Sequence, residues 1–367
     1  MVPGGPARKR RVERLIEEVE LADLEGVVIA PGPNLAYYTG VRAQLLERPF
    51  MLFVERSGRV DLLAPRLETG PFQGSGQDMA FYEWTDNEGP APALKRLLSK
   101  LNLGRRWGCE GRVPFGFLDH LQSRGMKLKP ADPILQGIRA VKEHHELESL
   151  RKAAKVLVRS YLKIPDFLRS GMTEKELSQK FTEYALANGA DYAEMCMVQS
   201  GARAADPHSE TSSKKIAKGE SIVVDSVTFC DGYAADITRT FVIGKNPQVE
   251  KVYNSVLSAQ EKAIEAAREG ALVGKVDAAA RGSLSRDGLG EAFFHRTGHG
   301  LGLEVHEAPY IVSSGRERLA AGMVFTVEPG AYLPGKLGVR IEDDVVATKQ
   351  GRDVITSRLP KEFGWWR

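Results

Sequence analysis

The segment that most constrains the fold is a glycine-rich run around His299, where Gly298, Gly300 and Gly302 alternate with larger residues. Glycine lets the backbone approach a neighbouring group closely and adopt conformations closed to other residues. An imidazole in such a run can approach a metal or a substrate. The alternating residues 303–306 predict a strand that carries a second histidine, His306. Taken alone, a glycine-rich turn with one surface and one core histidine explains the segment equally well.

Length, charge, hydropathy and cysteine content limit the number of domains, the kinds of partner and the compartment that are expected. A chain of 367 residues predicts two domains. The net charge of +3 is small for this length, and it predicts neither a nucleic-acid partner nor an anionic membrane partner. No apolar run reaches the length of a membrane-spanning helix, and the N-terminus lacks an apolar signal-peptide core. Three scattered cysteines indicate a reducing compartment, so we expect a cytoplasmic protein.

The distribution of predicted elements favours two domains of different class. Strands and helices alternate up to about residue 130, which is typical of a small α/β domain with a partly parallel sheet. The stretch from Pro130 to Gly137 then resembles a boundary, so the predicted domains are 1–137 and 138–367. The second half mixes helices and strands without strict alternation and is predicted to be α+β.

Two aspartates lie on neighbouring predicted strands. Asp225 ends the apolar strand 221–225, and Asp236 lies on the returning strand 235–242 after an Asp231-Gly232 turn. Because side chains alternate along a strand, Asp236 shares its face with Thr238 and can meet Asp225 across the hairpin. Two carboxylates that face each other in an apolar sheet repel, so they need a cation or a shared proton.

Two glutamates extend this pattern. Glu328 ends the predicted strand 323–328, and Glu342 shares a face with Arg340 on the predicted strand 339–342. The four carboxylates balance the charge of two divalent ions, with His299 as a nitrogen ligand and a bridging hydroxide to complete the shell. This oxygen-rich set suits Mn²⁺, and Co²⁺ or Zn²⁺ also fit it. Each acid taken singly is explained as well by an ordinary surface ion pair.

The order and spacing of these residues resemble those of the creatinase/aminopeptidase P/prolidase superfamily of metallopeptidases, which has the pita-bread fold. The matching motifs are the two aspartates eleven residues apart, Gly298-His299-Gly300, Val327-Glu328-Pro329-Gly330 and Arg340-Ile341-Glu342-Asp343. The resemblance covers the chain from about residue 143 onward. The first part resembles, more loosely, the creatinase-type N-terminal domain.

The resemblance implies a role for each residue of the site. Asp225 would hold one metal ion, His299 and Glu328 the other, and Asp236 and Glu342 would bridge both. Glu328 would also pass a proton from water to the leaving amine. The residues implied to contact substrate are His208, His306 and Arg340, of which Arg340 would otherwise support the bridging ligands. His295 matches no implied role, and a packing role is expected for it.

The resemblance further implies hydrolysis of the Xaa-Pro bond in a small peptide that has proline at its second position. We expect a dipeptidase (prolidase) that forms a homodimer. The alternatives are an aminopeptidase P that acts on longer peptides and, from another class, a non-catalytic binding module on the same fold. Many prolidases have an arginine shortly after the His-Glu pair to hold the substrate carboxylate, whereas this chain has Tyr310. Arg48 of the N-terminal domain is the predicted substitute, reaching the site of the neighbouring subunit, and a solvated loop arginine is the alternative for it.

Overall fold

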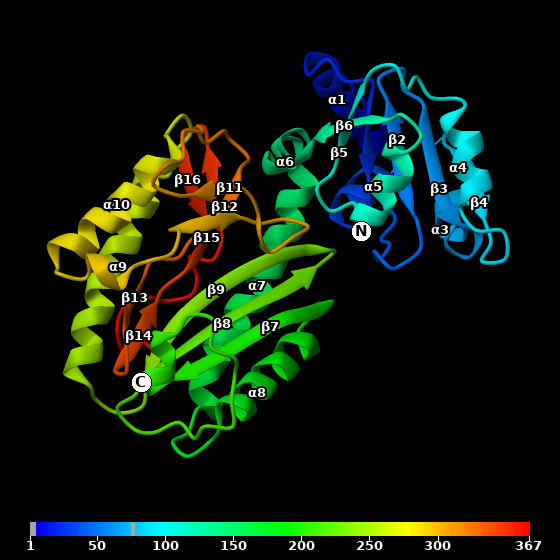
Figure 1. Cartoon of the computed structure of the whole chain (residues 1–367). Helices are drawn as coiled ribbons and strands as arrows, with labels where there is room; N and C mark the ends of the chain where they lie inside the picture. The colour runs from blue at the N-terminus through cyan, green and yellow to red at the C-terminus, as the bar shows by residue number, and fades with distance from the viewer. Residues whose placement is uncertain (1–4, 75–77) are drawn as a thin grey trace. The chain divides into compact units, whose positions relative to one another are not determined.

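The computed structural model describes residues 5–74 and 78–367 of the chain. It divides into two compact units, Met1–Arg139 and Ala140–Arg367 (Figure 1). The predicted boundary between residues 137 and 138 falls within helix α6 (Asp132–Ala140), which also contains the observed division. Each unit has its own cluster of buried apolar side chains.

The first unit is a mixed sheet with helices packed on it. Its elements before α6 are α1 (Gly5–Leu21), β1 (Gly26–Ile29), α2 (Pro33–Thr39), β2 (Met51–Glu55), β3 (Val60–Pro65), η1 (Arg66–Glu68), α3 (Gly70–Gln73), β4 (Ala80–Trp84), α4 (Ala91–Leu98), β5 (Arg106–Cys109), α5 (Phe115–Gln122) and β6 (Lys127–Pro130). The strand order is β4-β3-β2-β1-β5-β6, with parallel pairing at β3–β4, β1–β5 and β5–β6. Every residue of β1, β2 and β3 is buried, because both faces of the sheet are covered. The predicted α/β class is confirmed.

The second unit is α+β, as predicted. Its helices are α7 (His144–Phe167), α8 (Glu174–Ala187), η2 (Gly201–Ala205), α9 (Pro247–Ala266), α10 (Val273–Arg286) and η3 (Gly290–Ala292). Its strands are β7 (Tyr192–Ser200), β8 (Ser221–Cys230), β9 (Tyr233–Val242), β10 (Gly298–Gly300), β11 (Glu307–Ile311), β12 (Val324–Val327), β13 (Gly330–Leu333), β14 (Leu337–Arg340), β15 (Asp343–Thr348) and β16 (Gly351–Val354).

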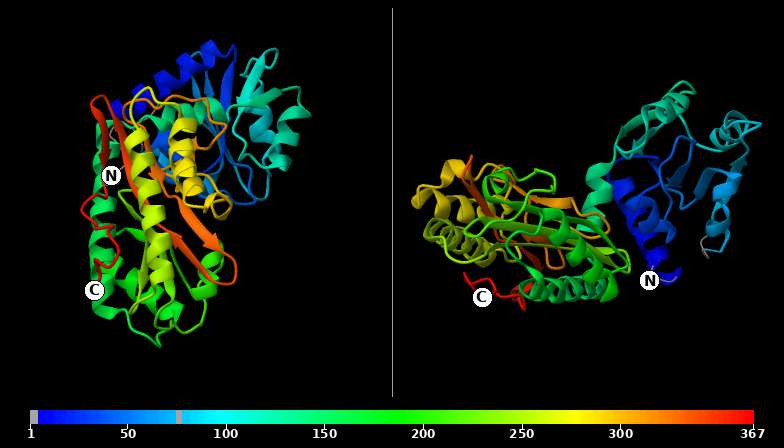
Figure 2. Two further views of the ribbon diagram at one scale, coloured as in Figure 1. Left: turned by 90° about the vertical axis from the view of Figure 1, so that its left-hand side faces the viewer. Right: turned by 90° about the horizontal axis from the view of Figure 1, so that it is seen from below.

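Three sheets build the second unit. One is the antiparallel sheet β7-β8-β9, the second has the order β11-β10-β12-β15-β16, and β13 pairs with β14 alone. Helix α7 packs on β8 and β9, and α8 packs on β7. Helices α9 and α10 lie side by side against the strands of the C-terminal half (Figure 2). The helices therefore cover the sheets from outside and leave the inner faces of the strands to the polar residues described below.

The residues at the start of α8 explain why the helix begins there. The side chain of Thr173 accepts a hydrogen bond from the backbone N–H of Glu176, and the Glu176 carboxylate accepts one from the backbone N–H of Thr173, which forms a capping box. Across residues 5–74 and 78–367, no helix combines the length and the apolar character that a bilayer crossing requires.

Three strand predictions are wrong in detail, of which the third, for residues 339–342, concerns Glu342 and is described with the site. Strand β8 continues to Cys230, so Asp225 lies in the middle of the strand and not at its end. Residues 303–306 form no strand, because the chain bends there: the Gly302 N–H bonds to the Glu304 carbonyl, and the Gly302 carbonyl accepts the N–H of Ala234 on β9. The turn at Asp231 and Gly232 is confirmed, with left-handed φ values of 50° and 84°.

Candidate metal centre

The β8–β9 hairpin presents the two aspartates on one face. Asp225 lies opposite Thr238, and Asp236 lies opposite Val227. Residues directly opposite in an antiparallel pair share a face, so Asp225 and Asp236 are diagonal neighbours on the same face. Both are buried, with 8% and 4% of their surface exposed. Water therefore screens neither carboxylate well.

His299 lies on β10, between β11 and β12. A Cβ on Gly298 would stand 1.8 Å from the Thr326 carbonyl oxygen, and one on Gly300 would stand 2.1 Å from that of Ala308. The two glycines therefore allow β10 to lie close to both β11 and β12. The His299 Nδ1 lies 3.1 Å from the Gly300 carbonyl oxygen, and its Nε2 lies 3.8 Å from Asp236 Oδ2. An Nδ1–H that donates to a carbonyl leaves Nε2 as a lone-pair donor that faces the acids.

The two glutamates reach the same place from the ends of strands. Glu328 follows β12 directly, and its Oε1 lies 3.3 Å from His299 Nε2. Glu342 lies between β14 and β15, outside the strand predicted for it. Thr238 holds Glu342 with two hydrogen bonds: its hydroxyl donates to Glu342 Oε2 at 2.7 Å, and its carbonyl accepts the Glu342 N–H at 3.0 Å.

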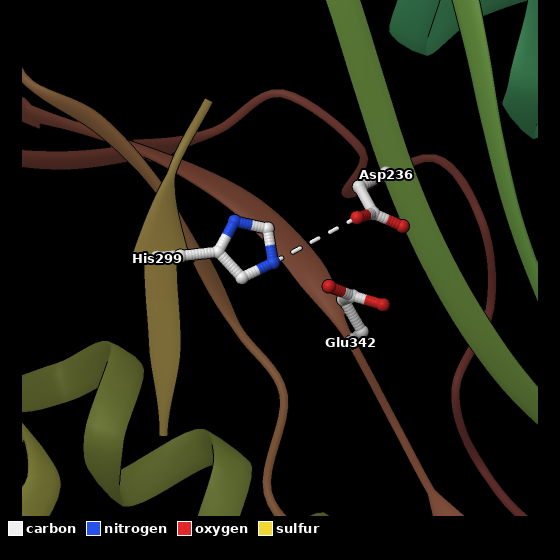
Figure 3. Close-up of side chains that lie close together, drawn as sticks. All are labelled: Asp236, His299 and Glu342. Carbon is white, nitrogen blue, oxygen red and sulfur yellow. Dashed lines mark ion pairs between the residues drawn. The ribbon is translucent and has the colours of Figure 1, made fainter. Parts of the chain in front are cut away.

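Asp236, His299 and Glu342 converge on one point. A ligand atom of each lies within 4.8 Å of the others, and all three residues are buried (Figure 3). Asp236 Oδ1 and Glu342 Oε1 are buried with no hydrogen-bond partner in the part of the chain that the structure describes. Buried oxygens without a partner are costly unless a cation or a proton satisfies them. The donor set therefore fits a divalent metal ion.

The electrostatics of the cluster lead to the same conclusion. Burial, and then repulsion from neighbouring carboxylates, raises the pKa of Asp236 and of Glu342 well above their ordinary values. Burial raises the pKa of Glu328 to about 7 and lowers that of His299 to about 3. The imidazole is therefore neutral, which is the form that binds metals. The raised pKa values of the carboxylates show that neighbouring cations do not fully offset their negative charges.

Arg340 lies on β14, and its guanidinium is fully engaged. Nη2 donates to Asp225 Oδ2 at 2.6 Å, Nε donates to the Thr238 hydroxyl at 3.1 Å, and Nη1 donates to the Tyr332 hydroxyl at 2.9 Å. Only 3% of the residue is exposed. Of the two roles predicted for Arg340, this geometry favours the support of metal ligands over contact with a substrate carboxylate.

The predicted substrate-binding residues come from different elements of the chain. His306 is exposed on the bend before β11, and its ring meets that of His299 edge to face with centroids 4.2 Å apart. His208 is exposed on the loop after η2. Tyr310 pairs with His299 across the β10–β11 ladder. Arg48 belongs to the first unit, where it forms a two-point ion pair with Asp86 at 2.9 and 3.0 Å.

Two residues near the centre were missed by sequence reasoning. Tyr332 on β13 accepts from Arg340 and lies 2.9 Å from His295 Nε2, so His295 has the packing place expected for it. Arg296 stacks on Tyr310, with its guanidinium carbon 4.9 Å from the ring centroid. Arg296 stands two residues before the glycine-rich run, and this position could have identified it as a residue near the site. Nothing in the sequence identifies Tyr332.

Comparisons with known proteins agree with this geometry. Residues 148–349 match the model of metallopeptidase family M24, and residues 11–141 match the creatinase/prolidase N-terminal domain. A probable dipeptidase PepE of Mycobacterium tuberculosis is 36% identical over 347 residues, which are 93% of this chain and 92% of the relative. The Xaa-Pro dipeptidase of Pyrococcus horikoshii is 32% identical over 355 residues, 94% of this chain and 96% of that protein.

A solved structure extends the likeness to the fold. The crystal structure of dipeptidase PepE from Mycobacterium ulcerans superposes with a TM-score of 0.92 at 36% identity, and the match covers 98% of this chain and 97% of that one. Fold and site define a metallopeptidase with the pita-bread catalytic domain. The chain belongs to metallopeptidase family M24 and carries the creatinase/prolidase N-terminal domain. Membership of this family implies that it binds divalent metal.

Proposed function

We propose that this metallopeptidase hydrolyses the Xaa-Pro bond of dipeptides. The observation that carries the proposal is the buried cluster of Asp236, His299 and Glu342, in which two carboxylate oxygens have no partner among the described residues. The names of the relatives, a probable dipeptidase and an Xaa-Pro dipeptidase, support the short substrate.

Two divalent ions are proposed for the site, with Mn²⁺ as the metal that best suits its ligands. The proposed ligands are Asp225, Asp236, His299, Glu328 and Glu342. Such ions supply a water of lowered pKa and stabilise the charge that develops on the substrate carbonyl. Of these residues, Asp236, His299 and Glu342 lie closest together, so the scissile bond is proposed to lie beside them.

Glu328 is proposed to move the proton. Burial raises its pKa to about 7 in the metal-free chain, and a bound cation would lower it again, so its carboxylate would be ionised and ready to accept a proton. Its Oε1 lies beside His299 Nε2 and within 3.4 Å of the Thr326 hydroxyl, which orients it towards the centre. We propose that Glu328 accepts a proton from the attacking water and delivers it to the departing proline nitrogen.

The two exposed histidines are proposed to contact the substrate. The His306 ring packs against the His299 ring, and burial lowers the pKa of His306, so it is neutral at pH 7. A neutral imidazole N–H that points at the reacting carbonyl would stabilise the tetrahedral intermediate. His208 is proposed for the same task from the loop after η2.

Two alternatives remain from the sequence. An aminopeptidase P would use the same centre on longer peptides, and a binding module would keep the fold with acids that hold no metal. Proteins of the first kind need room beyond the proline, whereas a dipeptidase needs a group that recognises a free carboxylate. We also propose a cytoplasmic homodimer.

A paired hydrolysis assay on Mn²⁺-loaded protein tests the proposal. One substrate is an Xaa-Pro dipeptide and the other an Xaa-Pro tripeptide, with bound metal measured on the same sample. Cleavage of the dipeptide alone is the expected result, and cleavage mainly of the tripeptide would favour aminopeptidase P. Bound metal without cleavage of either would refute the Xaa-Pro substrate, and the lack of bound metal would favour the binding module.

A further inference from the structure

Recognition of a dipeptide poses an electrostatic problem at this site. The substrate carboxylate lies one residue from the scissile bond, which is about 3.5 Å of extended chain. It must therefore lie beside four buried or half-buried carboxylates, Asp225, Asp236, Glu328 and Glu342, whose charges two divalent ions would only balance. A positive side chain near the centre, with free donors, would give the substrate carboxylate a partner of its own.

Two arginines near the centre differ in how many of their N–H groups are already hydrogen-bonded. Arg340 is buried, and each of its three nitrogens already donates to Asp225, Thr238 or Tyr332. Arg296 is half-buried, and its guanidinium has no ion pair or hydrogen bond to any residue in the described parts of the chain. Its recorded contact is the face of the Tyr310 ring, 4.9 Å from the guanidinium carbon. Of these two arginines, Arg296 is therefore the one with unused donors.

The strand pairing places this stacked pair beside the metal centre. Tyr310 lies directly opposite His299 in the β10–β11 ladder, so the two side chains share a face. Arg296 precedes His299 by three residues at the entrance to β10. The charge of Arg296 is felt at the centre, because it opposes the rise that burial causes in the pKa of Glu328 and adds to the fall that burial causes in the pKa of His306.

We infer that Arg296, which lies over the ring of Tyr310, binds the C-terminal carboxylate of the dipeptide. Stacking on an aromatic face fixes the plane of a guanidinium and leaves the N–H groups at its edge free. Two parallel N–H groups match the two oxygens of a carboxylate. The inference rests on the proposed dipeptidase function, and it identifies the pair as the feature that selects a free acid over an amide or a longer chain.

The test compares an Xaa-Pro dipeptide with its C-terminal amide, using Mn²⁺-loaded protein. For the wild type, we expect kcat/KM to be on the order of 10- to 100-fold higher for the acid. Arg296→Met should raise KM for the acid by a similar factor, abolish the preference over the amide and leave bound metal unchanged. The matched control is Arg286→Met, an exposed arginine at the end of α10, which should keep the preference.

Two further variants separate the guanidinium from the ring. Arg296→Lys keeps the charge and loses the paired donors, so part of the preference for the acid should be lost. Tyr310→Phe should retain the preference, whereas Tyr310→Leu should weaken it, because only the former keeps a ring beneath Arg296. Calorimetric binding of free proline and of prolinamide gives a readout without turnover, in which Arg296→Met should remove the advantage of proline.

The outcomes distinguish the inference from the proposed function. If the metal-loaded wild type cleaves neither the dipeptide nor its amide, the proposed function fails. If the wild type cleaves the dipeptide and Arg296→Met keeps the preference for the acid, the inference alone is overturned. An unchanged preference in Tyr310→Leu would overturn the role of the ring.

Discussion

Arg340 Nη2 lies 2.6 Å from Asp225 Oδ2, and this contact joins β14 to the middle of β8. Both residues are buried, so the ion pair is poorly screened. The same guanidinium donates to the Thr238 hydroxyl, which in turn donates to Glu342. One arginine therefore orients two of the proposed metal ligands, Asp225 directly and Glu342 through Thr238.

Replacement of Arg340 should weaken metal binding. We expect Arg340→Met to lower metal affinity or kcat by on the order of 10- to 100-fold, since loss of a group that orients a ligand typically has this effect. Arg340→Lys should recover only part of the loss, because its single nitrogen cannot reach all three acceptors that the separate guanidinium nitrogens contact. Metal retained after dialysis and kcat at saturating Mn²⁺ are the measurements. Values within twofold of the wild type for both would show that Asp225 and Glu342 keep their orientation without Arg340.

Removal of the metal should make stability depend on pH through Glu328. Burial raises its pKa from 4.5 to about 7, so the folded chelated protein binds more protons than the unfolded chain between these values. The free energy of unfolding should therefore fall as pH rises through this window, by up to about 1.4 kcal/mol per pH unit for one group.

The comparison that isolates this effect uses Glu328→Gln, which cannot titrate. Between pH 5 and 8 in chelator, the Tm of the wild type should fall more steeply than that of the variant. Saturating Mn²⁺ should remove most of the difference, because the ions neutralise the carboxylates. Parallel Tm profiles of the two chelated proteins would mean that Glu328 is not strained by its burial.

The positions of several proposed metal ligands could be predicted from the sequence, because side chains alternate between the two faces of a strand. Asp236 and Thr238 share a face by period alone, and Glu328 stands at the end of an apolar strand in both sequence and structure. The glycines beside His299 predicted a close approach of the backbone, and the structure shows that the neighbours approached are strands β11 and β12.

Other features depend on contacts that no local pattern encodes. The bend at residues 303–306 arises because Gly302 bonds to Ala234 on β9, a pairing between segments far apart in the chain. Alternation in that segment therefore indicated a strand that does not exist. Tyr332 and Arg296 acquire their positions from β14 and β11, so their proximity to the centre appears only in three dimensions.

The prediction for Arg48 can be tested separately from that for Arg296. If Arg48 reads the substrate carboxylate, Arg48→Ala should raise KM for Xaa-Pro dipeptides and leave metal content unchanged. In the structure its guanidinium is held by Asp86, so Asp86→Asn should release it and lower KM. Steady-state kinetics of both variants are the measurement. Unchanged KM values in both would assign Arg48 to an ion pair on the surface of the first unit.

The glycine before His299 should not tolerate even a methyl group. A Cβ at position 298 would lie 1.8 Å from the Thr326 carbonyl, so Gly298→Ala must push β10 away from β12. We expect a loss of at least about 3 kcal/mol in stability, with loss of metal. The matched control is Gly137→Ala in α6, where no atom lies within 4 Å of the new Cβ and alanine favours the helix. Urea unfolding of both variants is the measurement, and equal unfolding midpoints would contradict the predicted loss of stability in Gly298→Ala.

A buried ion pair fixes the strand that follows His306. Lys142 Nζ lies 2.7 Å from Glu307 Oε1, and the two side chains are 1% and 3% exposed. Lys142→Met would leave the Glu307 carboxylate buried without this partner, which should cost about 3–5 kcal/mol. The double variant Lys142→Met/Glu307→Gln should be more stable than Lys142→Met, because it removes the buried charge that has lost Lys142. Urea unfolding of the metal-loaded proteins measures this order, and a double variant less stable than Lys142→Met would show that Glu307 is held by its other contacts.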